Sequence, residues 1–313
     1  MSEHCRLSII TINYNGLDDT CELLQTLPLD NPEVEVIVVD NASSADEATA
    51  IEQQFPQATV VRSPQNLGFA GGNNLGIRAA HGQYLFFVNN DTVFRTGDER
   101  LPAEEGEATR AAAMLQALTE RLESSEKIGA VCPKIRFAWD DNPIQYAGYT
   151  PLSPVTMRNR SIGFGERDGG QYDEAHPTPY AHGAAMMVKR EAISRAGLMP
   201  ECYFLYYEEL DWSMMLRRAG YDIWYEPRAT IYHKESRSTG QGSALRTYYI
   251  TRNRLLFVRR NVAAPRRWLA YLYLMLLVAP KDVAASMLRR RTDLACAIVR
   301  GVRHFLKQKT IDS

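Results

Sequence analysis

Three continuous runs of apolar and β-branched residues mark the first ninety positions of the chain, and each ends in polar residues. The runs are Leu7–Ile12, Val34–Val39 and Tyr84–Val88. Runs without polar alternation are typical of parallel strands covered on both faces. Helix-sized segments over 17–26 and 45–54 and a short strand near 59–62 lie between them. The resulting βαβαβαβ order predicts a right-handed, doubly wound α/β domain.

Polar side chains follow these predicted strands directly. In open α/β sheets, ligands collect at the carboxyl ends of the strands. Between the second and third runs, Gly68, Gly71 and Gly72 let the backbone approach a ligand closely, and the helix that follows would direct its N-terminal amides at negative charge. The sequence therefore predicts a nucleotide-binding edge. The residues at the strand ends are Asn13, Asn15, Asp40, Asn41, Asn89, Asn90 and Asp91.

The second half of the chain alternates ordered and irregular segments. A surface helix within 95–127 and a strand over 128–135 precede a region rich in Gly, Pro and Asp, residues 136–179. Irregular regions of this length usually form binding loops or a lid. Further on, Glu208, Glu209 and Asp211 open a predicted helix that stops at Gly220.

Five segments in this order carry a resemblance to a known family. They read INYNG, VDNASSAD, NLGFAGGNNLGI, FFVNND and FLYYEELDWSMMLRRAGY. Together they resemble the inverting family 2 glycosyltransferases, especially the rhamnosyltransferase-like branch, over about the first three quarters of the chain. The resemblance implies a GT-A-type fold with a mostly parallel central sheet over 1–240. The donor-binding half would cover about 1–135 and the acceptor-binding half about 136–240.

The resemblance also implies a catalytic base within the acidic segment. Inverting transfer needs a carboxylate that removes the proton of the acceptor hydroxyl as that oxygen attacks the anomeric carbon. The family motif maps its base onto Glu209, where the commoner residue is aspartate. Glu208 is the next candidate. Asp211, one helical turn further, is expected to cap the helix or orient its neighbours.

A metal and a sugar nucleotide follow from the same resemblance. Asp91 corresponds to the carboxylate ligand of Mn²⁺ or Mg²⁺, which stabilises the charge on the leaving diphosphate. His233 corresponds to a histidine near the metal, with an unrelated strand-end histidine as the alternative. Asp40 matches the acid that accepts a hydrogen bond from the imide of uracil or thymine, so the expected donor is a UDP- or dTDP-sugar, with rhamnose favoured. The other expected nucleotide-sugar contacts are Asn13, Tyr14, Asn15, Asn41, Asn66, Gly68, Asn74, Asn89 and Asn90.

The acceptor side is less specified. His182 and Gly183 match a segment that lies near the acceptor in the family, although a loop histidine without a role fits equally well. Trp212 would stack on the acceptor sugar or fill the core. The expected acceptor is a glycan or a polyprenyl-diphosphate-linked sugar in the synthesis of cell-surface polysaccharide.

The last part, residues 241–313, combines apolar and basic residues and predicts a helical extension. Its apolar run, Trp268–Pro280, has 13 residues, fewer than the roughly 20 that span a bilayer. Arginines flank it on both sides, which favours a peripheral anchor on an anionic membrane surface. A core helix or a subunit contact is the alternative.

Composition and motifs reduce the number of protein classes that fit the sequence. The net charge of -1 argues against a nucleic-acid-binding protein. The 5 scattered cysteines and the lack of an apolar leader favour a cytoplasmic protein. A peripheral anchor in 241–313 would place it at the inner face of the cell membrane. An oxidoreductase would need GxGxxG after the first strand, which is absent. A sugar nucleotidyltransferase and an inactive nucleotide-sugar-binding or scaffold protein remain as alternatives, the latter because Asn89 and Glu209 depart from the commonest family residues.

Overall fold

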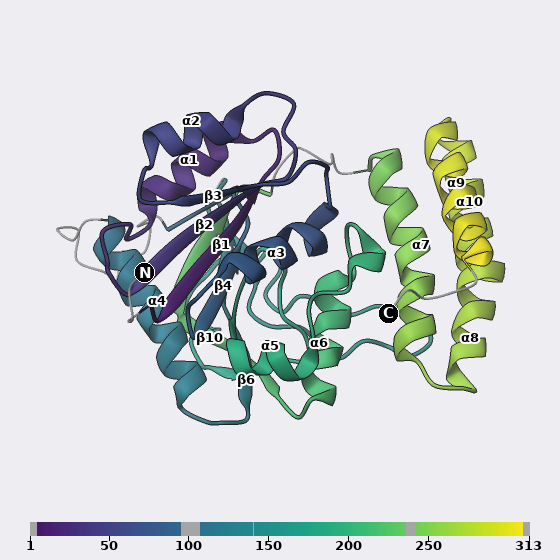
Figure 1. Cartoon of the computed structure of the whole chain (residues 1–313). Helices are drawn as coiled ribbons and strands as arrows, with labels where there is room; N and C mark the ends of the chain where they lie inside the picture. Colours follow the sequence, from purple (N-terminus) through teal and green to yellow (C-terminus); the bar gives the residue numbers. More distant parts are fainter. Residues whose placement is uncertain (1–4, 95–106, 140, 236–241, 309–313) are drawn as a thin grey trace.

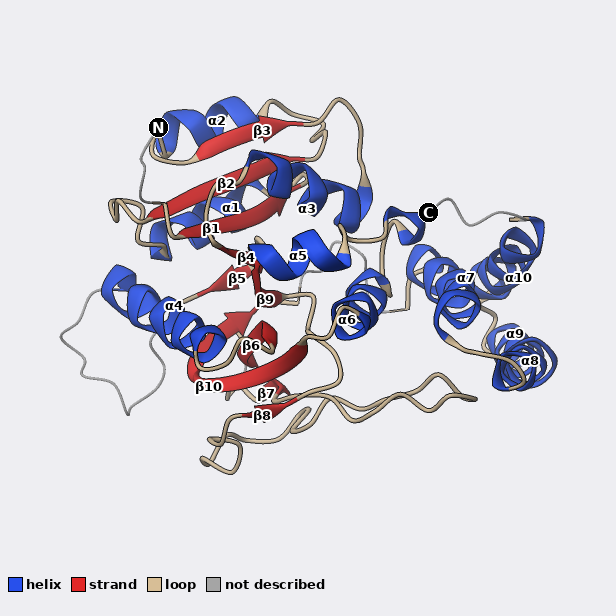
Figure 2. Cartoon of the chain, turned by 60° about the horizontal axis from the view of Figure 1, so that its bottom comes forward, coloured by secondary structure: helices blue, strands red, loops and turns tan. Residues whose placement is uncertain are grey.

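The computed structural model describes residues 5–94, 107–139, 141–235 and 242–308. A central mixed sheet is covered by helices, with α4 on one side and α3, α5 and α6 on the other (Figure 2). The strands are β1 (Leu7–Asn13), β2 (Val34–Asp40), β3 (Thr59–Arg62), β4 (Tyr84–Val88), β5 (Thr92–Val93), β6 (Ile128–Phe137), β7 (Ile144–Tyr146), β8 (His176–Pro177), β9 (Ala185–Lys189) and β10 (Asp222–His233). The helices of this part are α1 (Leu17–Thr26), α2 (Glu47–Gln54), α3 (Gly68–Ala79), α4 (Glu107–Glu123), α5 (Arg190–Ala196), α6 (Glu208–Arg218) and the 3₁₀ turn η1 (Glu201–Tyr203).

The strand order is β3-β2-β1-β4-β9-β6-β10-β5. The first four of these strands are parallel, and β6 is parallel to β10, which confirms the predicted α/β class with a mostly parallel sheet. The pairing of β1 with β2 sets Asn13 opposite Asp40. Strand β9 runs antiparallel between β4 and β6. Sequence patterning indicates no strand there, since five residues after a loop give too short a pattern.

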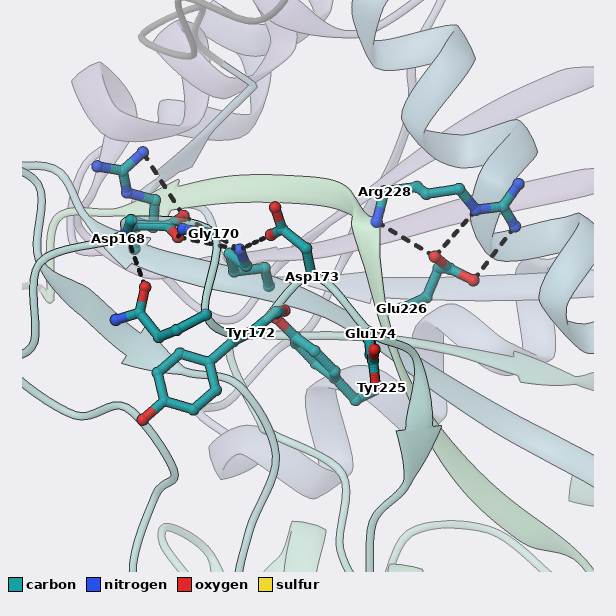
Figure 3. A network of polar contacts seen from close by, with 12 residues as sticks. Asp168, Gly170, Tyr172, Asp173, Glu174, Tyr225, Glu226 and Arg228 are labelled. Atoms are coloured by element: carbon teal, nitrogen blue, oxygen red, sulfur yellow. Dashed lines mark hydrogen bonds and ion pairs between the residues drawn. The ribbon is translucent and has the colours of Figure 1, made fainter.

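The irregular region 136–179 is fastened to the sheet through a buried lysine. Lys134 on β6 is fully buried, and its Nζ donates to Asp168 Oδ2 at 3.1 Å and to Asp173 Oδ1 at 2.6 Å. Tyr225 on β10 donates its hydroxyl to the carbonyl of Tyr172 at 2.9 Å (Figure 3). A buried ammonium needs paired charge, so these two carboxylates hold segment 168–173 against the strands.

Helices α7 to α10 form a layer beside the α/β domain (Figure 1). Their bounds are α7 (Ala244–Asn261), α8 (Arg266–Leu272), η3 (Tyr273–Val278, π-helical), α9 (Ala279–Leu288) and α10 (Thr292–Lys307). A second hydrophobic core joins α7, α8, η3 and α10 to Tyr203 and Tyr207. The predicted helical extension therefore shares its core with the loop that precedes α6.

Helix 266–288 is longer than the apolar run suggests. Segments α8, η3 and α9 follow one another without a break over 23 residues, long and apolar enough by length and composition to cross a bilayer. The π-helical stretch lies just before Pro280, whose ring clashes with the carbonyl four residues earlier and lacks an N–H. The prediction of a segment too short to span is therefore wrong in length, since the helix extends past the proline into Lys281–Leu288.

Candidate active site

The carboxyl ends of β1 and β2 form a polar cluster. Asn13 is fully buried, and its Nδ2 donates to Asp40 Oδ1 at 3.0 Å and to Glu47 Oε2 at 2.8 Å. Asn15 accepts from the backbone N–H of Ser44 at 2.8 Å. Tyr14 is 49% exposed, so its ring is free to flank a planar ligand at this edge. Buried amides and carboxylates that satisfy one another fix the position of Asp40.

The glycine turn contacts this cluster through Asn41. Its Nδ2 donates to Asn66 Oδ1 at 3.1 Å and to the Gly68 carbonyl at 3.2 Å, while its Oδ1 accepts from Leu67 N–H at 2.9 Å. Gly68 has φ +70°, and a Cβ there would lie 2.1 Å from the carbonyl oxygen of Phe204. Only glycine fits both the backbone angle and the contact.

Two of the expected nucleotide contacts have other partners. The Asn74 amide donates to the Met199 carbonyl at 2.9 Å and to Glu201 Oε1 at 2.8 Å, which ties α3 to η1. Asn90 Nδ2 donates to Thr20 Oγ1 at 3.0 Å and so holds the start of α1. Both amides therefore position the framework of the site. Asn89 is half-buried beside them, and its N–H donates to the Ala184 carbonyl at 2.9 Å.

Asp91 and His233 meet across two strands. Asp91 Oδ1 lies 3.1 Å from His233 Nε2, and the Asp91 carbonyl accepts from Lys234 N–H at 2.9 Å. On its other side, His233 Nδ1 lies 2.8 Å from Gln145 Oε1. Because an amide oxygen only accepts, Nδ1 donates to Gln145, which orients the ring with Nε2 toward Asp91. The two side chains are 4% and 7% exposed, so Asp91 is buried rather than at the open strand end that the sequence predicts.

This pair fits a divalent cation that binds with a diphosphate. Among the described residues no group of three or more His, Cys, Asp or Glu side chains could hold a metal by itself. Mn²⁺ and Mg²⁺ in such sites use one or two protein ligands and take their other oxygens from phosphate and water. A carboxylate and an imidazole whose second nitrogen is fixed by an amide are a suitable pair for that arrangement.

Glu208 and Glu209 lie at the N-terminus of α6 with different surroundings. Glu208 is 3% exposed, and its Oε1 accepts from Tyr206 N–H at 3.0 Å, whereas its Oε2 is buried without a hydrogen-bond partner. Burial and the charge of Glu209 raise the pKa of Glu208 well above its ordinary value. Burial also raises the pKa of Glu209, which is only half-buried. Of the two carboxyl groups, Glu208 is the more deeply buried and has its pKa raised further, so it holds a proton more readily than Glu209.

Glu209 faces the acceptor candidates. A Cβ on Gly183 would lie 3.7 Å from Glu209 Cγ, so the Glu209 side chain packs against this glycine. The His182 ring stacks with Tyr149 at a centroid distance of 5.9 Å. Burial and the neighbouring His233 lower the pKa of His182 to about 3, so this imidazole is neutral, and its Nδ1 accepts from Ala184 N–H.

Two predicted site residues belong to the framework instead. Trp212 is fully buried, donates Nε1–H to the Gly197 carbonyl at 2.9 Å and packs edge-on against Phe87 at 5.4 Å. Stacking on an acceptor sugar is therefore excluded for this ring. Asp211 is also fully buried and accepts from Tyr203 Oη at 2.9 Å, from Asn261 Nδ2 at 2.9 Å and from Arg260. It anchors α6 to α7 and is no candidate base.

Sequence patterning does not predict one further feature, the hydrogen bonds that Asn253 on α7 makes to the loop before Glu208. We call this contact the Asn253 clamp. Phe204, Tyr206 and Tyr207 all have positive φ, between 68° and 81°. The Asn253 amide is fully buried and donates to the carbonyls of Tyr203, Leu205 and Tyr206 at 3.1, 2.7 and 2.8 Å. Strained backbone persists only when its surroundings hold it. Asn253 is thus a positioning residue for the two glutamates.

We expect Asn253→Leu to lower the free energy of unfolding by about 2 kcal/mol or more, because buried carbonyls lose their donor. We also expect kcat to fall more than tenfold at an unchanged KM for the donor. Asn261→Leu is the matched control on the same helix, since Asn261 contacts Asp211 and not the loop. Urea unfolding and steady-state kinetics measure both effects. Equal loss of kcat in the two variants would contradict the clamp.

Comparison with known proteins finds similar glycosyltransferases. The model of glycosyl transferase family 2 matches residues 8–103, which include β1 to β4 and Asp91. The hexosyltransferase Agl10 of low-salt glycan biosynthesis in Haloferax volcanii is 23% identical over 97% of this chain and 92% of its own length. The N-acetylglucosaminyl-diphospho-decaprenol L-rhamnosyltransferase of Mycobacterium tuberculosis is 24% identical over 84% of this chain and 88% of its own.

Solved structures share the fold. The mannosyltransferase PcManGT from Pyrobaculum calidifontis, in complex with GDP-Man and Mn²⁺, has a TM-score of 0.56 at 18% identity, covering 99% of this chain and 89% of that one. GalNAc-T7 with UDP, GalNAc and Mn²⁺ has a TM-score of 0.59 at 13% identity, covering 91% and 58%. The chain has a GT-A-like fold, and its residues 8–103 match glycosyl transferase family 2.

Proposed function

We propose that this protein is a glycosyltransferase, inverting and metal-dependent, that moves a sugar, with rhamnose favoured, from a dTDP- or UDP-sugar to a lipid-linked or glycan acceptor. The observation that carries the proposal is the arrangement of Glu209. Its half-buried side chain lies in the first turn of α6 and packs against Gly183, and α6 contacts β10, the strand that ends in His233. An inverting transfer needs one such carboxylate on the acceptor side and no nucleophile.

Each group of site residues would have its own role in the reaction. Asp40, held by Asn13, would accept a hydrogen bond from the imide of the base, and Tyr14 would flank it. Asp91 and His233 would hold Mn²⁺ or Mg²⁺, which when bound stabilises the negative charge of the leaving diphosphate. Glu209 would take the proton of the acceptor hydroxyl as that oxygen attacks the anomeric carbon. Burial of Glu208 disfavours a second negative charge beside this position.

The acceptor class is supported by the decaprenol-linked substrate in the name of the mycobacterial relative. It is also supported by helix 266–288, of whose most apolar window only 22% is buried within the structure. Five large apolar side chains of this helix are between 53% and 64% exposed: Trp268, Leu269, Leu272, Leu276 and Leu277. Exposure of such an apolar patch to water is unfavourable, and the arginines at both ends of the helix would interact favourably with anionic lipid. The enzyme would therefore work at the cytoplasmic membrane surface.

A nucleotide-sugar screen tests the activity. We expect one UDP- or dTDP-sugar to raise the melting temperature with Mn²⁺ present, because a ligand that binds only the folded state stabilises it. The same sugar nucleotide should then be hydrolysed slowly without an acceptor. Binding without hydrolysis or transfer would favour the inactive binding protein. Release of diphosphate from a sugar phosphate and a nucleoside triphosphate would favour the nucleotidyltransferase.

The membrane contact has its own prediction. We expect Leu276→Asp combined with Leu277→Asp to abolish flotation with anionic liposomes at low salt, while the melting temperature changes little because both side chains are exposed. Phe164→Asp, a change at a side chain of 62% exposure on the α/β domain, should float as the unchanged protein does. If the double variant still floats, the exposed apolar face is not what contacts the bilayer.

A further inference from the structure

A cavity of about 310 Å³ lies within the helical layer, between α7, η3, α9 and α10. Its lining changes in character from one end to the other. Arg246, Arg289 and Arg291 come from the start of α7 and the junction of α9 with α10. Leu274, Val278 and Val302 line it further along the helices. A basic mouth and an apolar interior together suit a hydrocarbon chain with an anionic head group.

The acidic residues near the basic end of the cavity do not neutralise all of its arginines. Asp282 lines the cavity and pairs with Lys281 at 3.3 Å, and Arg291 pairs with Asp293 at 2.8 Å. Within the described part of the chain, Arg246 and Arg289 make no ion pair. Arginine is well suited to phosphate groups because its planar guanidinium offers paired donors.

The cavity also shares a wall with the loop that carries the candidate base. Arg254 lines the cavity and donates from Nε to the Tyr207 hydroxyl at 3.0 Å. The guanidinium of Arg246 lies 5.8 Å from the centroid of the Tyr206 ring. Tyr207 directly precedes Glu208 and Glu209 in the chain. A head group at the arginines would therefore be next to the loop that holds the glutamates.

We propose that this cavity binds the first part of the prenyl chain of a polyprenyl-diphosphate acceptor, with the diphosphate on Arg246 and Arg289. The inference rests on the proposed function for the identity of the acceptor. The volume is at the lower end of the roughly 300 to 1,000 Å³ of ligand pockets, so it holds a short stretch of the chain. The rest of a longer chain would continue along the exposed apolar face of helix 266–288 into lipid.

Farnesyl diphosphate is the probe, with farnesol and inorganic diphosphate as its two halves, and EDTA is present to suppress metal-dependent binding at the nucleotide site. We expect Ala285→Phe, which fills the cavity, to weaken farnesyl diphosphate binding at least tenfold in calorimetry. Ala284→Phe is the control, because the neighbouring Ala284 is exposed and does not line the cavity. Arg246→Gln should weaken farnesyl diphosphate but leave farnesol unchanged.

Nucleotide-sugar binding in Mn²⁺ should be the same in all three variants, which separates this site from the donor site. Unchanged farnesyl diphosphate affinity in Ala285→Phe would overturn the cavity while the transferase proposal stands. Equal binding of inorganic diphosphate and farnesyl diphosphate would also overturn it. Should Ala285→Phe fail to fold, Arg246→Gln decides, since its expected loss is confined to ligands with the head group.

Discussion

Glu209→Gln is expected to lower kcat at least about a hundredfold while sugar-nucleotide affinity stays the same. A hundredfold loss corresponds to about 2.7 kcal/mol of transition-state stabilisation and lies at the lower end of general-base contributions. The amide keeps the shape of the side chain, so contacts that depend on packing remain. Single-turnover transfer and calorimetry with the donor measure the two quantities separately.

The pH profile adds an independent readout for the same carboxylate. Because burial raises the pKa of Glu209, the base is lost at a higher pH than an ordinary glutamate would be. Activity should therefore be full above this raised pKa and fall as the pH drops through it, and Glu209→Gln should remove that limb. Glu208→Gln is the matched control, expected to retain most of kcat because burial favours the neutral form of Glu208, which the amide resembles. Loss of activity in Glu208→Gln with Glu209→Gln unaffected would reverse the two roles.

Asp91→Asn is expected to remove the effect of Mn²⁺ on donor binding, a loss of at least tenfold in affinity for the nucleoside diphosphate. The amide preserves the volume of the side chain but removes the charge that holds a cation beside the phosphates. Calorimetry of UDP and dTDP with Mn²⁺ and with EDTA measures this difference. Asp19→Asn is the control, since Asp19 is a half-buried acid on α1 that pairs with Lys234 next to His233. Metal-dependent affinity that survives in Asp91→Asn would remove Asp91 from the cation site.

The strands of the donor half could be predicted because their signal is local. Leu7–Asn13, Val34–Asp40 and Tyr84–Val88 are mostly apolar and β-branched, and the parallel register of the first two brings Asn13 and Asp40 together. The metal pair could be predicted only through the family motifs. The orientation of the His233 ring depends on Gln145, which lies 88 residues from His233 in the sequence and belongs to no recognisable motif.

Sequence patterning could not find what depends on long-range packing. The residues on either side of Trp212 in the sequence do not indicate whether its ring faces a sugar or the core. Its edge-on contact with Phe87 places the ring in the core. The Asn253 clamp joins positions 47 to 50 residues apart, and nothing in the polar residues of a helix indicates which carbonyls they meet. The length of helix 266–288 was hidden by Pro280, which normally marks a boundary but here is accommodated by a π-helical stretch.

Gly68 joins the two halves of the site through their backbones. Its neighbour Phe69 donates its N–H to the Phe204 carbonyl at 2.8 Å, and the absent side chain of Gly68 makes this approach sterically allowed. The donor turn and the loop before Glu208 therefore have no layer of side chains between them that could absorb a displacement. A sugar nucleotide that displaced the turn would therefore displace the loop as well. Because coupling between two sites is reciprocal, donor and acceptor would then change each other's affinity by the same factor.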